Sequence, residues 1–437
     1  MKRTILFLPF MIFLALLTAA CGAAPTPDTI IQTVEVEKEI EVEVEKEVVV
    51  TPTPGSAEPV KLVFLRSGGE GEKEIVGLQV EAFTAETGIE VEMVMVPWGQ
   101  GFQKMMTMVG SGNAPDVAYT GSRYIPSLAE MGAIAPIAVP ADRQAEYADS
   151  IWGMVTWNGI IYGVPRAFSS KVLYYNRDLF EQAGLDPDSP PTTWDELEAA
   201  AKAINENTDA YGFALAGAKF VSTTSQFFNF LYQNGGEVID ADGNVVINSP
   251  EAVEALEFYA RLADYAEPGP IAHQREDLWE LFAEEVVGMY VSGPWRRAAF
   301  IDAGINFGVA PLPAGPNGAS STILVSDSLI IFSQSEHLEE AQQLVLYLTS
   351  RKNQETLDTT WGMTPARPAE AELAFFQDDP TWKPFVDMVP RGKAQPLVSD
   401  WNLLEDALTD AIQAVLLGEL DAQTALDRVA AKLKAGQ

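Results

Sequence analysis

Aromatic, acidic and arginine side chains follow three strands that the sequence predicts. Glu70 comes after the first strand, Trp98 after the second, and Thr120, Ser122 and Arg123 after the third. A flat aromatic ring packs against the apolar faces of a ligand, while carboxylate and guanidinium groups form strong, directional hydrogen bonds with hydroxyl groups. Because open α/β sheets bind ligands at the carboxyl ends of their strands, these residues are candidates for ligand contact. The alternative for each is a structural role, since a tryptophan is often half-buried core and a loop glutamate is often solvated.

The sequence contains no comparable motif for covalent catalysis, metal binding or nucleotide binding. Cys21 is the only cysteine, so the chain cannot form an internal disulfide or a zinc site built from several cysteines. The two histidines, His273 and His337, lie in no motif typical of a catalytic triad or a metal site. The glycine-rich run at 67–71 has neither the GK[ST] ending of a phosphate loop nor a GxGxxG pattern. We therefore expect no catalytic residue, no metal and no cofactor.

Composition and length limit which classes of protein and which domain organisation are possible. The formal net charge is −34 without a basic patch, which argues against nucleic-acid binding because phosphates are bound by clustered lysines and arginines. The chain is 47% hydrophobic, too apolar for general disorder. Its 437 residues exceed the roughly 250–300 at which a single core stops growing, so two lobes are expected.

The first twenty residues have the features of an export signal. Lys2 and Arg3 precede an apolar run at 5–17 that is too short to span a bilayer comfortably. The residues before Cys21 resemble a bacterial lipobox, except that Thr18 stands where Leu, Val or Ile is usual. We expect a signal peptide over 1–20, lipidation of Cys21, and anchoring by acyl chains on the extracytoplasmic face of the cell membrane. The alternative is a secreted protein with a free thiol.

A biased segment follows the cysteine. It contains the repeat TVEVEKEI at 33–40 and EVEVEKEV at 41–48, in which apolar residues alternate with charged ones. Its many glutamates repel one another, so we interpret 21–59 as an extended stalk between the lipid and the folded body. A self-associating ribbon or helix is the alternative.

The body alternates strand-like and helix-like segments, which predicts an α/β fold with mainly parallel sheets. Strands are expected at 60–65, 89–96 and 116–119, and helices at 72–87, ending at Gly88, and at 102–109.

Later helices have clear start signals. Thr193 and Glu196 form a capping box, and Ser249 followed by Pro250 is an N-cap with proline in the first turn. The apolar spacing of Ala341, Leu344, Val345 and Leu348 predicts a helix with one buried face.

Four segments carry a resemblance to a known family. They are 110–137, which begins GSGNAPDV; 161–197, which contains VLYYN and ends TTWDEL; 282–295, FAEEVVGMYVSGPW; and 349–368, which contains TTWGMTPARP. Together they resemble the extracellular solute-binding proteins of ABC importers, in the sugar-type family that also takes up maltodextrins and glycerol-phosphate-type ligands. The VLYYN and TTWDEL pair is specific, whereas the Gly-x-x-Pro-Asp motif is weak alone. The resemblance covers nearly all of 60–437.

The resemblance implies a two-lobed, periplasmic-binding-protein-like fold of type II. One lobe would comprise 60–167 and 314–365, and the other 168–313 and 366–437. A sugar would bind in the cleft between them, and the closed protein would deliver it to the membrane permease without catalysis. We expect a monomer that contacts the membrane through its lipid alone.

The resemblance also implies further site residues, beyond those that follow the first three strands. Arg166 and Phe168 would lie at the first crossover between lobes, and Tyr174 beyond it. The family places its cleft aromatic at Gly293–Trp295, and Trp361 and Arg367 approach the last crossover. Asp327 and Trp401 complete the set. A structural ion pair is the alternative for each of the two crossover arginines, and core packing for each tryptophan.

Three other functions remain open at this stage. The same scaffold could hold another solute, such as glycerol 3-phosphate or an oligopeptide. A surface glycoside hydrolase is the second, since carboxylate pairs are abundant in an acidic protein. The third is a ferric-ion protein that uses Tyr174 and Tyr175, although adjacent strand residues point to opposite faces and only one could enter a cleft.

Overall fold

The computed structural model describes residues 59–69 and 72–436, which lie within one compact unit, Glu58–Gln437. The expected signal peptide (1–20), lipidated Cys21 and nearly all of the stalk (21–59) lie outside the described residues, as does Glu70. In the described ranges, no helix has the length and apolar character needed to cross a bilayer.

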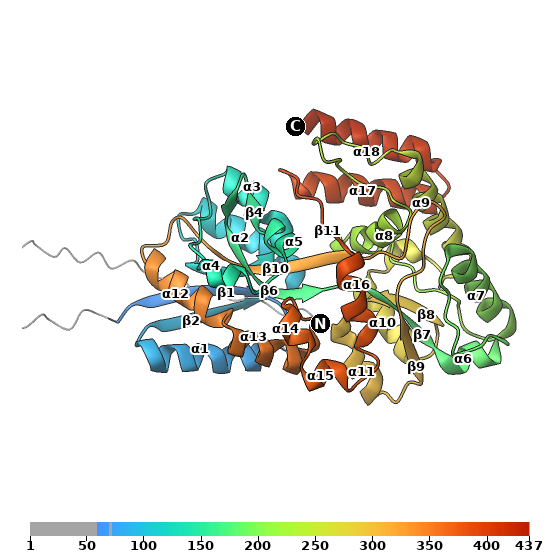
Figure 1. The fold of residues 1–437 in the computed structure, drawn as a ribbon. Coiled ribbons are helices and arrows are strands. Elements are labelled where there is room, and N and C mark those ends of the chain that lie inside the picture. Colours follow the sequence, from blue (N-terminus) through green and yellow to red (C-terminus); the bar gives the residue numbers. More distant parts are fainter. Residues whose placement is uncertain (1–58, 70–71, 437) are drawn as a thin grey trace, which may run out of the picture. The chain divides into compact units, whose positions relative to one another are not determined.

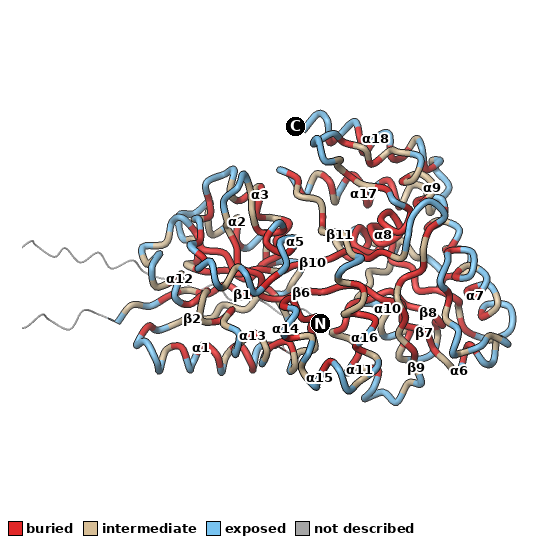
Figure 2. The backbone as a smooth tube through the Cα atoms, in the orientation of Figure 1, coloured by how far each residue is buried: buried red, intermediate tan, exposed pale blue. Residues whose placement is uncertain are grey.

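The unit contains two hydrophobic cores. The first core, as we call it, is built from buried residues between Leu62 and Phe168 and between Leu324 and Ala366. The second core is built from buried residues between Val172 and Ile323 and between Phe376 and Leu433. Figure 2 shows buried backbone concentrated inside two separate halves. The chain therefore passes from one core to the other three times.

The first core is formed by the N-terminal elements and a later return of the chain (Figure 1). Its N-terminal elements are β1 (Lys61–Ser67), α1 (Lys73–Thr87), β2 (Glu90–Val96), η2 (Trp98–Gln100), α2 (Gly101–Gly110), β3 (Val117–Gly121), η3 (Ser122–Tyr124), α3 (Ile125–Glu130), α4 (Ala141–Gln144), α5 (Asp149–Gly153), β4 (Thr156–Trp157), β5 (Ile160–Ile161) and β6 (Gly163–Ser169). The return supplies β10 (Ile323–Ile331), α12 (Leu338–Leu348), α13 (Arg351–Leu357) and the π-helix η7 (Asp358–Gly362).

The second core is formed by the middle of the chain and its C-terminal end. The middle supplies β7 (Val172–Asn176), α6 (Arg177–Gln182), α7 (Trp194–Asn207), α8 (Val221–Gln233), α9 (Pro250–Leu262), η4 (Ala263–Tyr265), η5 (Pro270–Ala272), α10 (Arg275–Ala283), β8 (Met289–Ser292), η6 (Pro294–Arg296), α11 (Arg297–Asp302) and β9 (Phe307–Ala310). After the last crossing come α14 (Pro368–Ala371), α15 (Ala374–Gln377), α16 (Lys383–Met388), η8 (Val389–Arg391), β11 (Lys393–Ala394), α17 (Trp401–Leu416) and α18 (Ala422–Gly436).

The sheets are more antiparallel than the sequence predicts. In the larger sheet, of order β11-β10-β3-β1-β2, β1 pairs in parallel with β2 and β3, but β10 runs antiparallel to β3 and β6. The second sheet, β8-β7-β9, is antiparallel throughout. The prediction of mainly parallel sheets is therefore wrong. Strand β10 enters its sheet from the other core, so it is not the product of a strand–helix–strand crossover that would make it parallel.

The local signals are confirmed. Helix α1 ends at Gly88, which has φ of 75° and donates its N–H to the carbonyl oxygen of Thr84. Thr193 and Glu196 form the expected capping box of α7, and Ser249 caps α9. The apolar stripe of α12 is fully buried. These features depend on residues close in sequence, which explains why they were predictable.

The lobe boundaries expected at 167/168, 313/314 and 365/366 stay a prediction. Buried residues change from one core to the other between Phe168 and Val172, between Ile323 and Leu324, and between Ala366 and Phe376. The second change lies within β10, about ten residues later than the expected boundary, because this strand contributes to both cores.

The capping box of α7 gives a test of local stability. Replacing Thr193 with Ala leaves the backbone N–H of Glu196 without its cap, and we expect a loss of about 1 kcal/mol in the free energy of unfolding. Urea unfolding of the purified protein measures it. Thr356→Ala, at an exposed position inside α13, is the control and should cost less than about 0.3 kcal/mol. Equal losses in the two variants would contradict the capping role.

Candidate ligand-binding site

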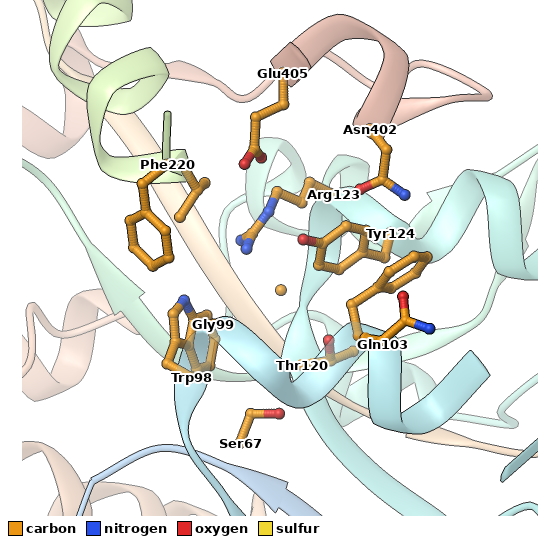
Figure 3. Close-up of a pocket in the computed structure, with 13 residues that line it drawn as sticks. Ser67, Trp98, Gly99, Gln103, Thr120, Arg123, Tyr124, Phe220, Asn402 and Glu405 are labelled. Carbon is orange, nitrogen blue, oxygen red and sulfur yellow. The ribbon is translucent and has the colours of Figure 1, made fainter. Parts of the chain in front are cut away.

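A pocket of about 280 Å³ lies where the first and second cores meet. The first core contributes the ends of β1 and β3 and the short helices that follow β2 and β3, and the second core contributes the N-terminal ends of α8 and α17. The lining residues are Ser67, Trp98, Gly99, Phe102, Gln103, Thr120, Gly121, Arg123 and Tyr124 from the first core, and Phe220, Val221, Asn402 and Glu405 from the second (Figure 3).

Aromatic rings form much of the pocket wall. Phe102 and Tyr124 stack with ring centroids 4.1 Å apart, and Tyr124 packs against both cores. Figure 3 shows Trp98 and Phe220 across the pocket from Tyr124. Phe220 comes from the second core, yet a Cβ atom on Gly99 of the first core would lie 3.1 Å from its ring. The rings thus offer flat apolar surfaces from both cores to one ligand.

The guanidinium group of Arg123 is the central polar group of the pocket. It lies 4.6 Å from the ring of Tyr124 and 5.7 Å from that of Trp401, and its Nη1 lies 4.0 Å from Oδ1 of Asp327. Arg123 is 4% exposed, and its Nε has no hydrogen-bond partner among residues 59–69 and 72–436. A Cβ on Gly121 would collide with this guanidinium in its present position, so glycine leaves room for it there.

The carboxyl groups around Arg123 are shifted towards their protonated forms. Burial raises the pKa of Asp327 to about 6, although Arg123 and Lys171 act in the opposite direction. Burial also raises the pKa of Glu405, which accepts a 2.6 Å hydrogen bond from Nε1 of Trp401. Burial acts to lower the pKa of Arg123, but Tyr124 and the two carboxyl groups together raise it. Arg123 therefore stays charged, with acceptors on both sides.

A second group of predicted residues gathers around Trp295. The side chain of Trp295 belongs to the second-core segment but packs against the first core, and η6, which carries it, contacts η7, which carries Trp361. Lys171 Nζ and the guanidinium of Arg275 lie 4.9 Å and 5.1 Å from the Trp295 ring. A Cβ on Gly293 would collide with this ring. Gly293 therefore allows Trp295 to fold back against the junction.

Most of the sequence-predicted residues reach the junction of the two cores. Trp98, Thr120 and Arg123 line the pocket itself. Asp327 and Trp401 do not line the pocket, but both lie close to the guanidinium group of Arg123. Ser122 is buried beside them and shares a 2.6 Å hydrogen bond with Ser328.

Four predicted residues lie elsewhere, and burial in a core explains each. Tyr174 lies inside the second core, where its hydroxyl donates to the carbonyl oxygen of Gly293 at 2.9 Å. Phe168 is part of the first core. Arg166 donates to the carbonyl oxygen of Leu348 and to the Gln79 side chain.

Arg367 has a wholly structural set of contacts. It pairs with Glu146 at 2.7 Å and Glu370 at 2.8 Å, and it donates to the carbonyl oxygen of Thr349 at 2.7 Å. For both crossover arginines, the structure therefore favours the alternative of a buried structural role over ligand contact.

The lining residues that escaped the sequence reasoning include Phe102, Gln103, Tyr124, Phe220, Asn402 and Glu405. Phe102 and Tyr124 each lie within four residues of a predicted contact, so the loop positions alone could have indicated them. Phe220, Asn402 and Glu405 have no such signal. They lie about 100 to 300 residues from the first-core residues that they face, and only the packing of the two cores brings them together.

A family model and two known proteins match much of this chain. The family model described as bacterial extracellular solute-binding protein matches residues 68–355. A binding protein of Brucella abortus (strain 2308) is 30% identical over 363 residues, which cover 81% of this chain and 88% of that protein. The maltooligosaccharide ABC transporter solute-binding lipoprotein of Streptococcus pneumoniae (strain R6) is 25% identical over 382 residues, covering 84% and 86%.

A similar structure has been solved with a sugar. An ABC transporter solute-binding protein from Thermotoga lettingae, bound with α-D-tagatose, is 28% identical and has a TM-score of 0.77. The match covers 86% of this chain and 99% of that one. The two-lobed fold of the solute-binding proteins is therefore the fold of this chain.

The shifted pKa of Asp327 gives a prediction about stability. A raised pKa means that the folded state holds a proton that the unfolded state has released, so the free energy of unfolding of the wild type falls as pH rises from about 4 to about 6. Asp327→Asn removes this titration. The stability of the variant relative to the wild type should therefore increase by about 2–3 kcal/mol between pH 4 and pH 7.

Urea unfolding at several pH values measures this difference. The exposed residue Asp302 provides the control Asp302→Asn, whose difference from the wild type should be nearly constant over the same range. A constant difference for Asp327→Asn as well would show that burial does not shift this carboxyl group.

Proposed function

Because the chain belongs to the bacterial extracellular solute-binding protein family, we propose that it captures a sugar between its two lobes and delivers it, chemically unchanged, to an ABC permease. The observation that carries the proposal is the pocket between the two cores, in which aromatic rings surround Arg123, Gln103, Asn402 and Glu405. A pyranose ring presents apolar C–H faces to such rings and hydroxyl groups to such polar side chains. The sugars named for the relatives in pneumococcus and Thermotoga support the same ligand class.

Closure of the lobes completes the binding site in this proposal. Neither core alone supplies a full wall, because Trp98 and Arg123 belong to the first core, and Phe220 and Glu405 to the second. A sugar that contacts both walls binds the closed arrangement more tightly than the open one, so it shifts the equilibrium towards closure. The permease would then distinguish loaded protein from empty protein by its conformation.

Export and lipid anchoring complete the proposed role. A signal peptide over 1–20 and acylation of Cys21 would hold the binding unit at the extracytoplasmic face of the membrane, with 21–59 as a tether. We propose that the protein acts as a monomer.

A ligand screen tests the proposal as a whole. The purified protein is heated with individual mono- and oligosaccharides, and a sugar that binds the folded state should raise the melting temperature. Chromatography of the same mixtures should show the sugar intact. If hydrolysis products appear, the protein is a glycoside hydrolase and not a receptor. If only phosphorylated ligands raise the melting temperature, the ligand is another solute and not a neutral sugar.

The aromatic wall gives a more specific prediction. Replacing Trp98 or Phe220 with Ala removes a ring that would pack against the ligand, and each should weaken binding of the sugar by about 1–3 kcal/mol in titration calorimetry. Phe375→Ala, at a ring that is 39% exposed on α15 and does not line the pocket, is the control and should leave affinity unchanged. If both pocket variants fold and bind as the wild type does, the pocket is not the sugar site.

A further inference from the structure

Ser67, at the carboxyl end of β1, has a buried hydroxyl group without a hydrogen bond. Ser67 lines the pocket and is 2% exposed, and its Oγ has no hydrogen-bond partner within the ranges 59–69 and 72–436. Buried hydroxyl groups normally form a hydrogen bond with the protein, with a water molecule or with a ligand. The missing partner of Ser67 is therefore expected in the pocket itself.

The geometry of β1 separates Ser67 from the buried ion pair of its neighbour. Successive side chains of a strand point to opposite faces of the sheet, so Ser67 and Arg66 lie on different faces. The guanidinium group of Arg66 lies 4.4 Å from the ring of Tyr119 and 3.1 Å from the carboxyl group of Glu72. Because these contacts fix the direction of Arg66, they leave Ser67 on the opposite face.

Thr120 brings a second hydroxyl group to the same part of the pocket. In the parallel register of β1 with β3, Arg66 lies opposite Tyr119, so Ser67 and Thr120 are the next residues of the two strands. Both line the pocket, and Figure 3 shows them at its bottom, with Glu405 of the second core at the top. A ligand in the pocket therefore meets hydroxyl groups of the first core on one side and a polar side chain of the second core on the other.

Gly101, the first residue of α2, leaves room for the hydroxyl group of Ser67. A Cβ atom on Gly101 would collide with Oγ of Ser67 in its present position. The backbone of Gly101 has φ of −59° and ψ of −50°, an ordinary helical conformation that any residue adopts. Glycine weakens a helix relative to alanine, so the backbone alone gives no reason for glycine here. The space that it leaves is occupied by the hydroxyl group.

A serine hydroxyl group matches a sugar hydroxyl group in its hydrogen-bonding capacity. Each donates one hydrogen bond and accepts others, and each rotates to suit its partner. A C–H group in the same place does neither, so a deoxy sugar would leave the hydroxyl group of Ser67 unsatisfied in the closed pocket. A site that hydrogen-bonds a ligand hydroxyl group rejects the analogue that lacks it, because the buried polar group of the protein then stays unpaired.

We propose that Ser67 binds one hydroxyl group of the captured sugar and makes the protein select sugars that carry this hydroxyl group over their deoxy analogues. This inference rests on the proposed function and names a residue that determines its specificity. The aromatic rings of the pocket pack against the apolar faces of any sugar of suitable size. A hydrogen-bonding group at a fixed position recognises, in addition, where a hydroxyl group of the sugar lies.

Titration calorimetry with deoxy sugars tests the inference on the purified protein. The probes are D-glucose, D-galactose, D-mannose and maltose, each with its monodeoxy analogues, in which hydrogen replaces one hydroxyl group at a time. For a sugar that binds, we expect the wild type to bind one analogue about 10- to 100-fold more weakly than the parent sugar, because Ser67 loses its partner. Ser67→Ala should discriminate against that analogue less than about threefold and should keep the wild-type ratio at every other position.

A matched variant and a melting experiment separate a lost contact from a lost fold. Ser321 is also a buried serine, but its hydroxyl group donates to the carbonyl oxygen of Arg391 at 2.9 Å, and it does not line the pocket. Ser321→Ala should keep the wild-type ratio for every analogue, and the same change as in Ser67→Ala would overturn the inference. Without ligand, Ser67→Ala should melt no more than about 2 °C below the wild type, since its hydroxyl group has no protein partner to lose. A larger decrease would show that the protein satisfies this hydroxyl group, which also overturns the inference.

The remaining outcomes distinguish this inference from the proposed function. If Ser67→Ala and the wild type discriminate equally at every position, a water molecule and not the sugar satisfies Ser67. The inference is then wrong and the sugar receptor stands. If no sugar of this panel or of the ligand screen binds the wild type, the proposed function fails and the inference fails with it.

Discussion

The pairing of β10 with β3 and β6 is the constraint on which the rest of the structure depends. Ile323, at the start of β10, is buried in the second core, and Leu324, the next residue, is buried in the first. The antiparallel register then sets Asp327 opposite Gly121 in β3 and Ala167 in β6. Since Arg123 follows Gly121 by two residues, this register brings its guanidinium to Asp327 and places the pocket where the two cores meet.

The junction tolerates more buried charge than stability alone would favour. Arg66, fully buried, forms a 3.1 Å ion pair with Glu72, while its three nitrogens lack hydrogen bonds of acceptable geometry within the described residues. Burial raises the pKa of Glu72 to about 7. Side chains that break the rule of buried polar satisfaction are expected at functional sites, where a ligand supplies the missing partners.

A second buried network, around Arg367 and Arg166, differs from the Arg66 site because protein atoms accept the hydrogen bonds of its arginines. Arg367 joins Glu146, Glu370 and the carbonyl oxygen of Thr349, and Arg166 joins Gln79 and the carbonyl oxygen of Leu348. These arginines tie α1, α12, α14 and the segment after α4 together near the crossings between the cores. The contrast explains why residue type and position near a crossover did not identify ligand contacts. Arginines with protein partners and arginines without them are indistinguishable in the sequence.

The sequence by itself determined the features that arise from neighbouring residues. These include β1, β2, β3, α1, α2 and α12 of the first core, the end of α1 at Gly88, the cap at Thr193 and the turn positions of Trp98 and Arg123. Only the tertiary structure decided which distant residues complete the site, since Phe220, Asn402 and Glu405 face Trp98 through the packing of two cores. It also decided that Tyr174 is core and that β10 is antiparallel. The physical reason is that local conformation depends on propensity and short-range hydrogen bonds, whereas strand direction, burial and charge pairing depend on contacts across hundreds of residues.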